Sequence, residues 1–371
     1  MSEKAPKLDW DVIENQFPLP DEAREAILEA PVFGTRFTDH MITITWDKGE
    51  GWHSPRVEPY GPITMDPSAA VLHYGQEIFE GIKAYRHEDN SIWTFRPKDN
   101  AVRLQKSAHR MALPELPVEY FIDSLKQLIK LDAKWVPEPV NEKTLYIRPF
   151  EIAAESFLGV RPAERAEYRV IASPVGPYFT GGLKPVKIWV ALESTRAGKY
   201  GTGEAKTGGN YAASLLAQAE GKENGCSQVL FLDAETQTFI EELGGMNLFF
   251  VYKDGHVVSP SLTGTILRGI TRDSIIQLIK DRNISVEERR ITLEEVQLGV
   301  NDGEIVEIFA CGTAAVITPV GQLLGPNGMK IGKADQESGK LTASLRKELT
   351  DIQYGKIEDR HNWMVKLSDG E

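Results

Sequence analysis

The sequence of 371 residues is poor in cysteine and lacks clustered metal ligands. Its two cysteines, Cys226 and Cys311, are too few for a disulfide framework and do not form a C-x-x-C pair. We therefore expect a reducing, cytoplasmic setting in which both are small buried hydrophobic residues. The seven histidines are scattered, without an H-E-x-x-H motif or paired Cys/His spacing, so the sequence predicts no metal site.

Long hydrophobic runs and an excess of positive charge are also missing. No segment has the apolar length that crosses a bilayer, and residues 1–10 mix charges without an apolar core, which predicts a loosely held arm rather than a secretory signal. The formal net charge of -12 opposes the phosphate backbone of nucleic acids. Neither a membrane protein nor a nucleic-acid-binding protein is expected; the 41% hydrophobic and 26% charged residues are ordinary for a globular enzyme.

The length exceeds what one hydrophobic core usually supports, so two domains are expected. Residues 179–185 combine threonine, glycines and proline between two strand patterns, a composition typical of an interdomain connection. We therefore expect a small N-terminal domain at 1–178, a linker at 179–185 and a larger C-terminal domain at 186–371.

The hydrophobic periodicity predicts an α+β first domain and an α/β, barrel-like second domain. In the first, Pro149 is expected to mark a bulge or an edge strand. Helices are expected over 21–30, 98–111, 119–134, 209–222, 265–280 and 336–352. Strands are expected over 41–46, 92–95, 144–150, 168–174, 186–192, 228–232, 247–252 and 304–310.

Lys206 lies in the glycine-rich segment Gly201-Thr-Gly-Glu-Ala-Lys-Thr-Gly-Gly-Asn-Tyr211. A lysine whose ammonium form is disfavoured by its surroundings can attack a carbonyl and form a Schiff base, and neighbouring glycines let the backbone approach a bulky cofactor. The alternative is a solvated lysine in a mobile loop. The segment alone does not separate the two readings.

Other segments carry chemical groups in apolar settings. Glu242 stands before a Gly-Gly turn, where a buried carboxylate could pair with a pyridinium nitrogen or simply end a strand. Residues 262–272 lead from a Thr/Gly-rich loop into a helix whose start suits a phosphate, although an ordinary capped helix fits as well. Arg148 on a strand is either paired structurally or aimed at a carboxylate ligand, and Arg103 on a helix either binds phosphate or covers apolar surface.

Six motifs recur in a fixed order between about Thr64 and Val320. They are Leu72-His-Tyr-Gly-Gln-Glu-Ile-Phe-Glu-Gly-Ile-Lys83, Leu145-Tyr-Ile-Arg-Pro149, Val175-Gly-Pro-Tyr-Phe-Thr-Gly-Gly182, the Lys206 segment, Glu242-Leu-Gly-Gly-Met-Asn247 and Gly312-Thr-Ala314. In this order the chain resembles the branched-chain amino-acid aminotransferases, which are two-domain enzymes of fold-type IV that depend on pyridoxal 5'-phosphate. The extended N-terminal region is similar to the larger, mammalian-like branch of that family.

The resemblance implies a role for each matching residue. Lys206 would carry the cofactor as a Schiff base and move the proton between substrate and cofactor, and Glu242 would keep the pyridine nitrogen protonated. Tyr211 would donate to the phenolic oxygen. The remaining cofactor contacts implied are Arg103 and Thr313 and the backbone of Ile270 and Thr271 at the phosphate, together with Gly245 and Leu267.

The substrate side follows from the same resemblance. Phe79, Tyr146 and Tyr178 would form an apolar wall for leucine, isoleucine or valine, and the amides of Thr313 and Ala314 would receive the substrate carboxylate. Arg148 would bind the distal carboxylate of glutamate or 2-oxoglutarate, a charge that a fully dry pocket would reject. Tyr74 would reach the pocket of a second subunit across a homodimer interface.

Two positions depart from the family pattern. Mammalian members carry a redox C-x-x-C after the Gly-Thr-Ala turn, whereas Ala315 and Thr318 stand there in this sequence, so thiol control of that kind is not expected. Gly245 replaces a threonine of some relatives, so backbone contacts must replace that hydroxyl.

The sequence allows other interpretations, one of which fails. A D-amino-acid aminotransferase or an aminodeoxychorismate lyase would use the same lysine and glutamate; the extended N-terminus and the Tyr-Ile-Arg-Pro segment favour the branched-chain assignment. A P-loop nucleotide-binding module fails because Tyr200 and Ala205 occupy the required glycine positions. A structural α/β protein with an incidental lysine is the non-catalytic alternative.

Overall fold

The computed structural model describes residues 5–177, 183–333 and 337–370. Its contacts divide the chain into a first unit (1–178, 205–208 and 351–371) and a second unit (179–204 and 209–350). The segments 205–208 and 351–371, expected in the C-terminal domain, therefore group with the first unit. That unit also contains more residues than the second, which reverses the expected sizes. Most of the expected linker 179–185 lies outside the described residues.

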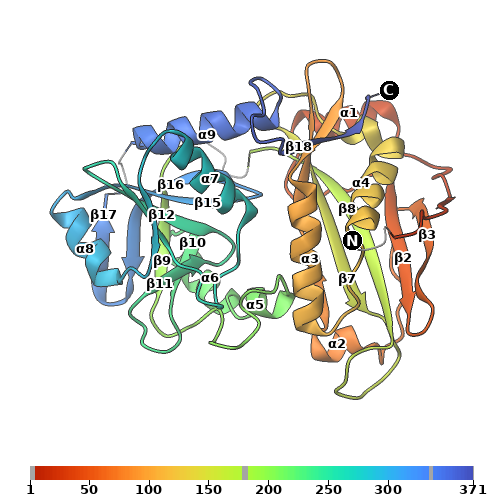
Figure 1. Cartoon of the computed structure of the whole chain (residues 1–371), viewed down its shortest axis with the longest axis horizontal. Helices are drawn as coiled ribbons and strands as arrows, with labels where there is room; N and C mark the ends of the chain where they lie inside the picture. The colour runs from red at the N-terminus through yellow and green to blue at the C-terminus, as the bar shows by residue number, and fades with distance from the viewer. Residues whose placement is uncertain (1–4, 178–182, 334–336, 371) are drawn as a thin grey trace. The chain divides into compact units, whose positions relative to one another are not determined.

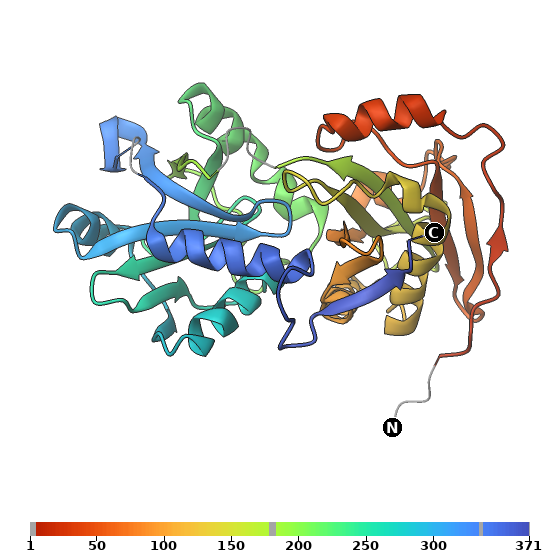
Figure 2. The ribbon, with the colours of Figure 1, turned by 90° about the horizontal axis from the view of Figure 1, so that it is seen from above.

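The first unit is built on a largely antiparallel sheet with strand order β1-β3-β2-β8-β7-β5-β6-β18, in which β4 also pairs with β7 (Figure 1). Its last strand, Met364–Ser368, pairs with β6, which is why the C-terminal segment joins this unit; Figure 2 shows the chain passing from α9 into it. The strands are β1 Asp11–Val12, β2 His40–Asp47, β3 Gly51–Pro59, β4 Glu77–Phe79, β5 Ile82–Arg86, β6 Ile92–Phe95, β7 Thr144–Ala153, β8 Arg165–Val175 and β18 Met364–Ser368.

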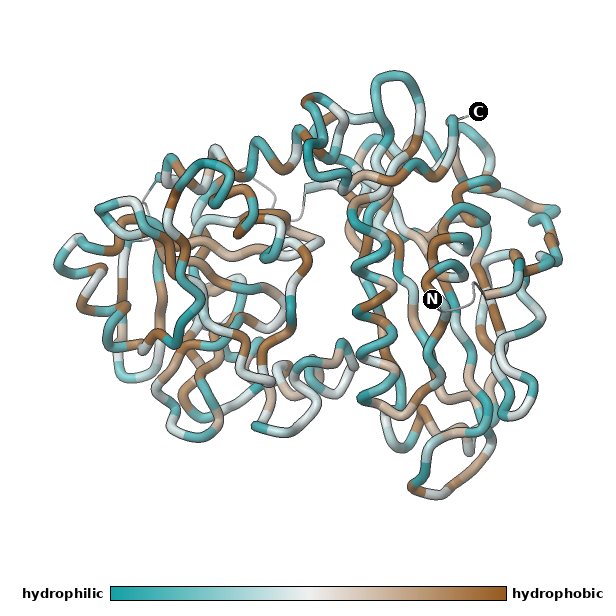
Figure 3. The backbone as a smooth tube through the Cα atoms, in the orientation of Figure 1, coloured by the Kyte–Doolittle hydropathy of each residue, from teal (hydrophilic) through white to brown (hydrophobic). Residues whose placement is uncertain are grey.

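Two long helices cover this sheet and close its core. In α4, Val118–Asp132, buried side chains recur at three- and four-residue spacing, including Phe121, Leu125 and Leu128, which forms one apolar stripe. Along α3, Pro97–Met111, hydrophobic and polar stretches also alternate (Figure 3). The shorter helices are α1 Asp21–Glu29 and α2 Ala70–Tyr74, with a 3-10 turn at Ala133–Trp135.

Pro149 lies in an inner strand, so the expectation of a bulge or an edge strand was wrong. Its strand β7 pairs with β8 without a register shift from Thr144 to Ala153. On the other side, β4 ends at Phe79 and β5 begins at Ile82, and the intervening Glu80 N–H donates to the Pro149 carbonyl at 2.7 Å. The missing N–H of proline is tolerated because the neighbouring strand is interrupted opposite it.

The second unit holds a mixed sheet with strand order β11-β10-β9-β16-β15-β12-β13-β14, and β17 also pairs with β16. The pairs β9–β10, β9–β16 and β13–β14 are parallel. Strand β11 also contacts β13, so the sheet curls, as the barrel-like expectation requires. The strands are β9 Val186–Ala191, β10 Gln228–Leu232, β11 Ile240–Leu243, β12 Asn247–Tyr252, β13 Val257–Pro260, β14 Val286–Arg289, β15 Ile305–Gly312, β16 Val316–Gly325 and β17 Met329–Gly332.

The helices of the second unit depart from the sequence pattern at two places. The helix expected over 209–222 is two short helices, and the helix expected from 265 begins at Ile270 because residues 262–268 form a loop. The Thr292 side chain caps α8 by accepting from the Glu295 N–H at 2.9 Å. The helices are α5 Gly208–Ala212, α6 Leu215–Glu223, α7 Ile270–Asp281, α8 Leu293–Asn301 and α9 Lys340–Gln353, with a 3-10 turn at Pro326–Gly328.

Both cysteines are free and buried, as the sequence predicts. The N-terminal arm is more firmly held than expected: β1 pairs with β3, and the Trp10 indole donates to Asp123 at 2.7 Å. Among the described residues, no helix is both long and apolar enough to cross a membrane.

Glu151 on β7 is fully buried, and neither of its carboxylate oxygens has a hydrogen-bond partner among the described residues. It pairs in the sheet with Tyr168 on β8 and with Ile78 on β4, both fully buried. Burial raises the pKa of Glu151 well above that of a free glutamate because the charged form is poorly solvated there. The folded protein therefore retains a proton that the unfolded chain releases.

This difference predicts a loss of stability with rising pH. The unfolded glutamate releases its proton at about pH 4.3, so the contribution is intact below that pH and declines as the pH rises toward the higher folded pKa. Glu151→Met should raise the urea midpoint at neutral pH and flatten its decline between pH 5 and 8. The exposed Glu164→Met serves as control, and an identical pH dependence in wild type and Glu151→Met would contradict the assignment.

Candidate active site

Lys206 belongs to a short segment held by two elements of the first unit. The Lys206 N–H donates to Ser107 Oγ on α3 at 2.9 Å. Its carbonyl accepts from the Phe79 N–H on β4, also at 2.9 Å. With donor and acceptor of one residue both engaged, the lysine backbone is fixed relative to the sheet. Lys206 is half-buried rather than a solvated loop lysine.

Glu77 on β4 holds the residues that follow the lysine. Its carboxylate accepts from the Gly208 N–H and from Thr207 Oγ1, the latter at 3.4 Å. Burial raises the pKa of Glu77, and these two hydrogen bonds oppose the rise. A side chain at Gly208 would approach Glu77 Oε1 to 2.5 Å. Glycine at position 208 therefore leaves room for the Glu77 carboxylate. The sequence analysis missed this packing constraint.

Four of the expected residues meet in the first unit around the Phe79 ring. Lys206 Nζ and Arg148 Cζ each lie 4.6 Å from the centre of that ring. Arg148 also donates to the Tyr146 hydroxyl at 3.1 Å. Its Nε is buried without a hydrogen-bond partner among the described residues. The result is an aromatic surface bearing two cations, which suits an apolar ligand that also carries negative charge.

Two further residues shape this surface. Gly81 faces Tyr146, and a side chain there would overlap the tyrosine hydroxyl, so only glycine permits this ring position. Phe33 packs edge-on against Tyr146 with 5.1 Å between ring centres. The Phe-Glu-Gly run within the 72–83 motif gave a sequence signal for Gly81, whereas nothing in the sequence linked Phe33 to this place.

Arg103 on α3 is buried and fixed by a carboxylate that the sequence analysis did not single out. Its Nε and Nη2 donate to the two oxygens of Glu80 at 2.8 and 2.7 Å. Asn100 Nδ2 donates to the same carboxylate at 2.8 Å. This forked pair orients the guanidinium more strictly than a single contact would.

Glu242 on β11 is the centre of a second group, in the second unit. The side chain is buried, forms an ion pair with Arg196 Nη1 at 2.9 Å and accepts from the Leu267 N–H at 2.8 Å. Asn247 Nδ2 lies 3.4 Å from its other oxygen. The charged partner and the backbone donor both favour a carboxylate over a neutral acid. Arg196 and Asn247 were missed. Arg196 lies in the loop after β9 and Asn247 begins β12, and no spacing pattern in the sequence linked either residue to Glu242.

The neighbouring Glu241 has a different environment. Successive strand residues point to opposite faces, and Glu241 accepts from Thr265 Oγ1 instead. Burial is the main cause that raises the pKa of Glu241. This acid lines a cavity of about 460 Å³ together with Phe239, Ile266 and Arg290. Both adjacent acids therefore contact the loop at 262–268, Glu241 through the Thr265 hydroxyl and Glu242 through the Leu267 N–H.

The start of α7 offers donors for an anion. Its first residue is Ile270, and Gly269 before it supplies no side-chain cap in the described structure. A side chain at Gly269 would overlap Asn247 Oδ1, so Asn247 fixes the approach of this loop. The first amides of such a helix, at Ile270 and Thr271, are not used within it and carry the positive end of the helix dipole.

The turn that contains Gly245 and Met246 lies next to the turn between β15 and β16, at one end of the second sheet. Asn247 pairs with Cys311, and Gly312 packs so closely on Gly245 and Met246 that an added methyl would come within 3.2 Å of Met246. The half-buried Thr313 and Ala314 occupy the second turn. The Tyr211 ring centre lies 6.0 Å from Arg196, the ion-pair partner of Glu242. The expected cofactor residues of the second unit therefore cluster around Glu242 and these turns.

Among the expected residues that the structure describes, Tyr74 belongs to neither group. Tyr74 ends α2 and is 41% exposed, with its ring against His73. Tyr178 lies outside the described residues.

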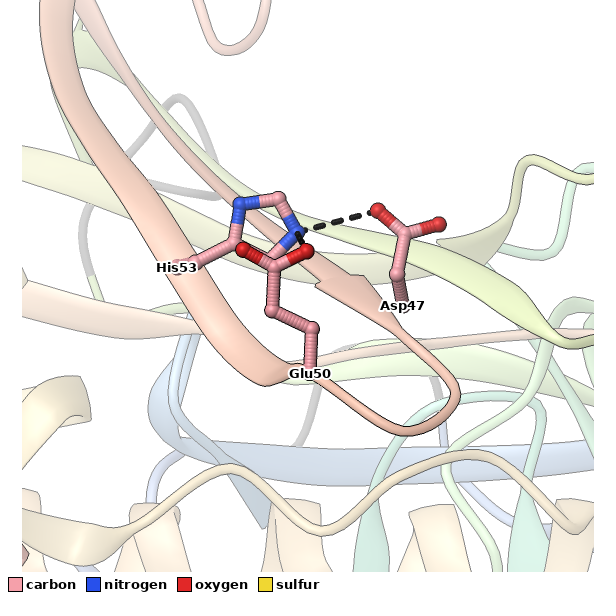
Figure 4. Close-up of side chains that lie close together, drawn as sticks. All are labelled: Asp47, Glu50 and His53. Atoms are coloured by element: carbon pink, nitrogen blue, oxygen red, sulfur yellow. Dashed lines mark hydrogen bonds and ion pairs between the residues drawn. The ribbon is translucent and has the colours of Figure 1, made fainter.

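Asp47, Glu50 and His53 form a separate cluster on the β2–β3 hairpin (Figure 4). His53 Nε2 lies 2.9 Å from Asp47 and 3.7 Å from Glu50. Arg165 Nη1 donates to both Asp47 oxygens, at 3.1 and 2.9 Å. The arginine already neutralises the central carboxylate, so the cluster works as an ion-pair network that joins β2, β3 and β8.

Comparison with known proteins identifies the lineage. The amino-transferase class IV family matches residues 77–323. The branched-chain-amino-acid aminotransferase of Mycolicibacterium smegmatis is 55% identical over 97% of this chain and 99% of its own length. The crystal structure of the Escherichia coli branched-chain amino acid aminotransferase superposes with a TM-score of 0.72 at 28% identity, over 88% of this chain and 99% of its own.

A third relative is the T.th. branched-chain amino acid aminotransferase, in a crystal structure complexed with N-(5'-phosphopyridoxyl)-L-glutamate. It superposes with a TM-score of 0.70 at 28% identity and covers 88% of this chain and 98% of its own. The matched family region spans both the Lys206 and the Glu242 groups. The chain therefore belongs to the amino-transferase class IV family, among the branched-chain-amino-acid aminotransferases.

Proposed function

We propose that this protein transfers amino groups reversibly between leucine, isoleucine or valine and 2-oxoglutarate, with Lys206 as the catalytic residue. The observation that carries the proposal is the Phe79 surface, where Lys206, Arg148 and Tyr146 meet in one unit. The substrate side chain is apolar in one half-reaction and anionic in the other. A reactive amine beside both an aromatic wall and an arginine suits the two cases.

The residues of the second unit fit pyridoxal 5'-phosphate, the cofactor of this class. The T.th. relative carries a phosphopyridoxyl compound. In this chain, a buried carboxylate paired with Arg196 suits a protonated ring nitrogen, and the uncapped start of α7 suits a phosphate. When bound, the cofactor supplies an aldehyde that captures the amino group and a ring that withdraws electrons from the substrate Cα.

Each residue then has a separate task. Lys206 Nζ would hold the cofactor between turnovers and, once released, would carry the proton between the substrate Cα and the cofactor carbon C4′. Glu242 holds the ring nitrogen protonated, and Tyr211 donates to the phenolic oxygen. Leu267 and Gly245 contact the cofactor ring. Leu267 also donates its N–H to Glu242.

The phosphate contacts come from four residues at three places in the chain. We assign them to Arg103, the amides of Ile270 and Thr271, and Thr313. Glu80 restricts how Arg103 can turn, because it binds two guanidinium nitrogens. A preoriented arginine loses less rotational freedom when it binds an anion, which favours tight cofactor retention.

Substrate selection uses the aromatic surface of the first unit. Phe79, Tyr146 and Tyr178 contact the branched side chain, and the amides of Thr313 and Ala314 receive the α-carboxylate. Arg148 stacks on Phe79 when the side chain is apolar and binds the distal carboxylate when it is not. Its buried Nε, without a partner in the described structure, is the donor that a carboxylate would satisfy.

We further propose a homodimer in the cytoplasm. In the first unit, exposed apolar side chains gather on α2 and in the loop that follows β7. A β-bridge between Ala69 and Ser156 brings these two segments together. They include Leu72 and Tyr74 on the helix and Phe157 and Leu158 in the loop. Covering such a patch favours association, and Tyr74 would then reach the partner's pocket. The two free, buried cysteines suit a reducing compartment.

The covalent role of Lys206 is testable by reduction. Borohydride treatment of the yellow holoenzyme should bleach its absorbance and add the cofactor mass to the peptide that contains Lys206. Lys206→Ala should lower turnover by a factor on the order of 10²–10⁴ or more while cofactor can still bind. The control is Lys199→Ala, an exposed lysine paired with Glu235. Appreciable turnover without Lys206 would exclude the assignment.

Arg148 should separate the two half-reactions. Arg148→Ala removes charged hydrogen bonds to the distal carboxylate, so kcat/KM for 2-oxoglutarate and glutamate should fall about 10- to 100-fold, with a smaller loss for leucine. Arg165→Ala, which removes an exposed arginine from the same sheet, is the control. Equal losses for leucine and 2-oxoglutarate would remove the proposed selective role.

A further inference from the structure

The turn between β15 and β16 contains a strained residue. Gly312 and Val316 pair across a reversal of three residues, Thr313 to Ala315. Val316 has φ of 60°, in the left-handed region. Reversals of this kind often contain a left-handed residue, which is usually glycine. A β-branched residue with positive φ is a genuine outlier and persists only where its surroundings hold it.

Arg346 on α9 holds this residue from both sides. Its Nη1 donates to the Ala315 carbonyl at 3.0 Å and to the Ile317 carbonyl at 2.6 Å. These carbonyls belong to the residues before and after Val316, and all three residues are buried. A charged donor shared by two buried carbonyls is stronger than a neutral contact, and it fixes the backbone across the strained position.

The helix that carries Arg346 is itself anchored to the same hairpin. Glu307 on β15 accepts from the Leu341 and Thr342 N–H groups at 3.1 and 2.9 Å and from Thr342 Oγ1 at 2.7 Å. A carboxylate at the first turn of a helix is favoured by the unpaired amides and the dipole there. Strand β15 thus fixes the start of α9, and α9 in turn fixes the turn that ends β15.

We propose that Arg346 is a positioning residue: by holding Val316 in its strained conformation, it sets the turn whose Thr313 and Ala314 receive the cofactor phosphate and the substrate carboxylate. The inference rests on the proposed function. The arginine touches neither cofactor nor substrate in this scheme. It acts through backbone geometry, so its loss should weaken binding of both ligands more than it slows the chemical step.

The experiment is a double-mutant cycle on the holoenzyme. Arg346→Met keeps the side-chain length and removes both hydrogen bonds; it should raise the pyridoxal phosphate dissociation constant and the KM for leucine about tenfold, with a smaller change in kcat. Val316→Gly removes the steric penalty, because glycine adopts positive φ freely. In the V316G background, R346M should therefore cost at most about threefold.

The matched control is Arg282→Met. Arg282 also binds α9, through Ser344 Oγ at 2.6 Å and Glu348, but the described structure shows no bond from it to the turn. R282M should lower thermal stability without raising KM or the cofactor dissociation constant. A KM increase in R282M equal to that of R346M would assign the effect to helix docking and overturn the proposal, as would equal costs of R346M in both backgrounds.

Two readouts keep the inference distinct from the proposed function. The midpoint of thermal unfolding should show the same coupling between positions 316 and 346 whether or not the protein transaminates. If R346M fails to fold, recovery of folding and cofactor binding in the V316G background supports the proposal, and failure of the double variant overturns it. Absence of leucine transamination in the wild-type protein, with the stability coupling intact, would refute the function alone.

Discussion

Two backbone hydrogen bonds at Lys206 fix the position of the proposed catalytic residue. The lysine N–H binds Ser107 and its carbonyl binds the Phe79 N–H, so the segment 205–208 groups with the first unit although its neighbours in the chain do not. This arrangement sets the amine beside Phe79 and Arg148. A lysine on a freely moving loop would spend little time in that place, because each rotatable residue lowers the population of the reactive geometry.

Three buried glutamates have different roles because they have different partners. Glu80 is bound by Arg103 and orients it, and Glu242 is bound by Arg196 and a backbone amide. Glu151 has no partner among the described residues and is therefore held in its neutral form. The same side-chain type thus orients an arginine, serves as a candidate partner for a ring nitrogen or stays neutral in the core, depending on the groups around it.

Much of the fold follows from periodicity, and the exceptions have identifiable causes. The spacing of apolar residues predicts α3, α4, β10 and β12 within a few residues of their observed bounds. The interior position of Pro149 could not be predicted from its own segment. It depends on the break between β4 and β5, which both pair with β7 but lie far from it in the chain. Residues 351–371, expected in the C-terminal domain, group with the first unit for a similar reason: β6, the partner of β18, lies far away in the sequence.

The sequence by itself determined the family, and it is the source of the proposal for the lysine and for the aromatic and basic residues around it, because ordered motifs preserve chemistry that needs particular side chains. Only the tertiary structure identified the residues that hold them: Ser107 and Glu80 in the first unit, and Arg196, Asn247 and Arg346 in the second. Such residues act through contacts between segments far apart in the chain. Their side-chain types are ordinary, and no local spacing records which distant atom each one binds.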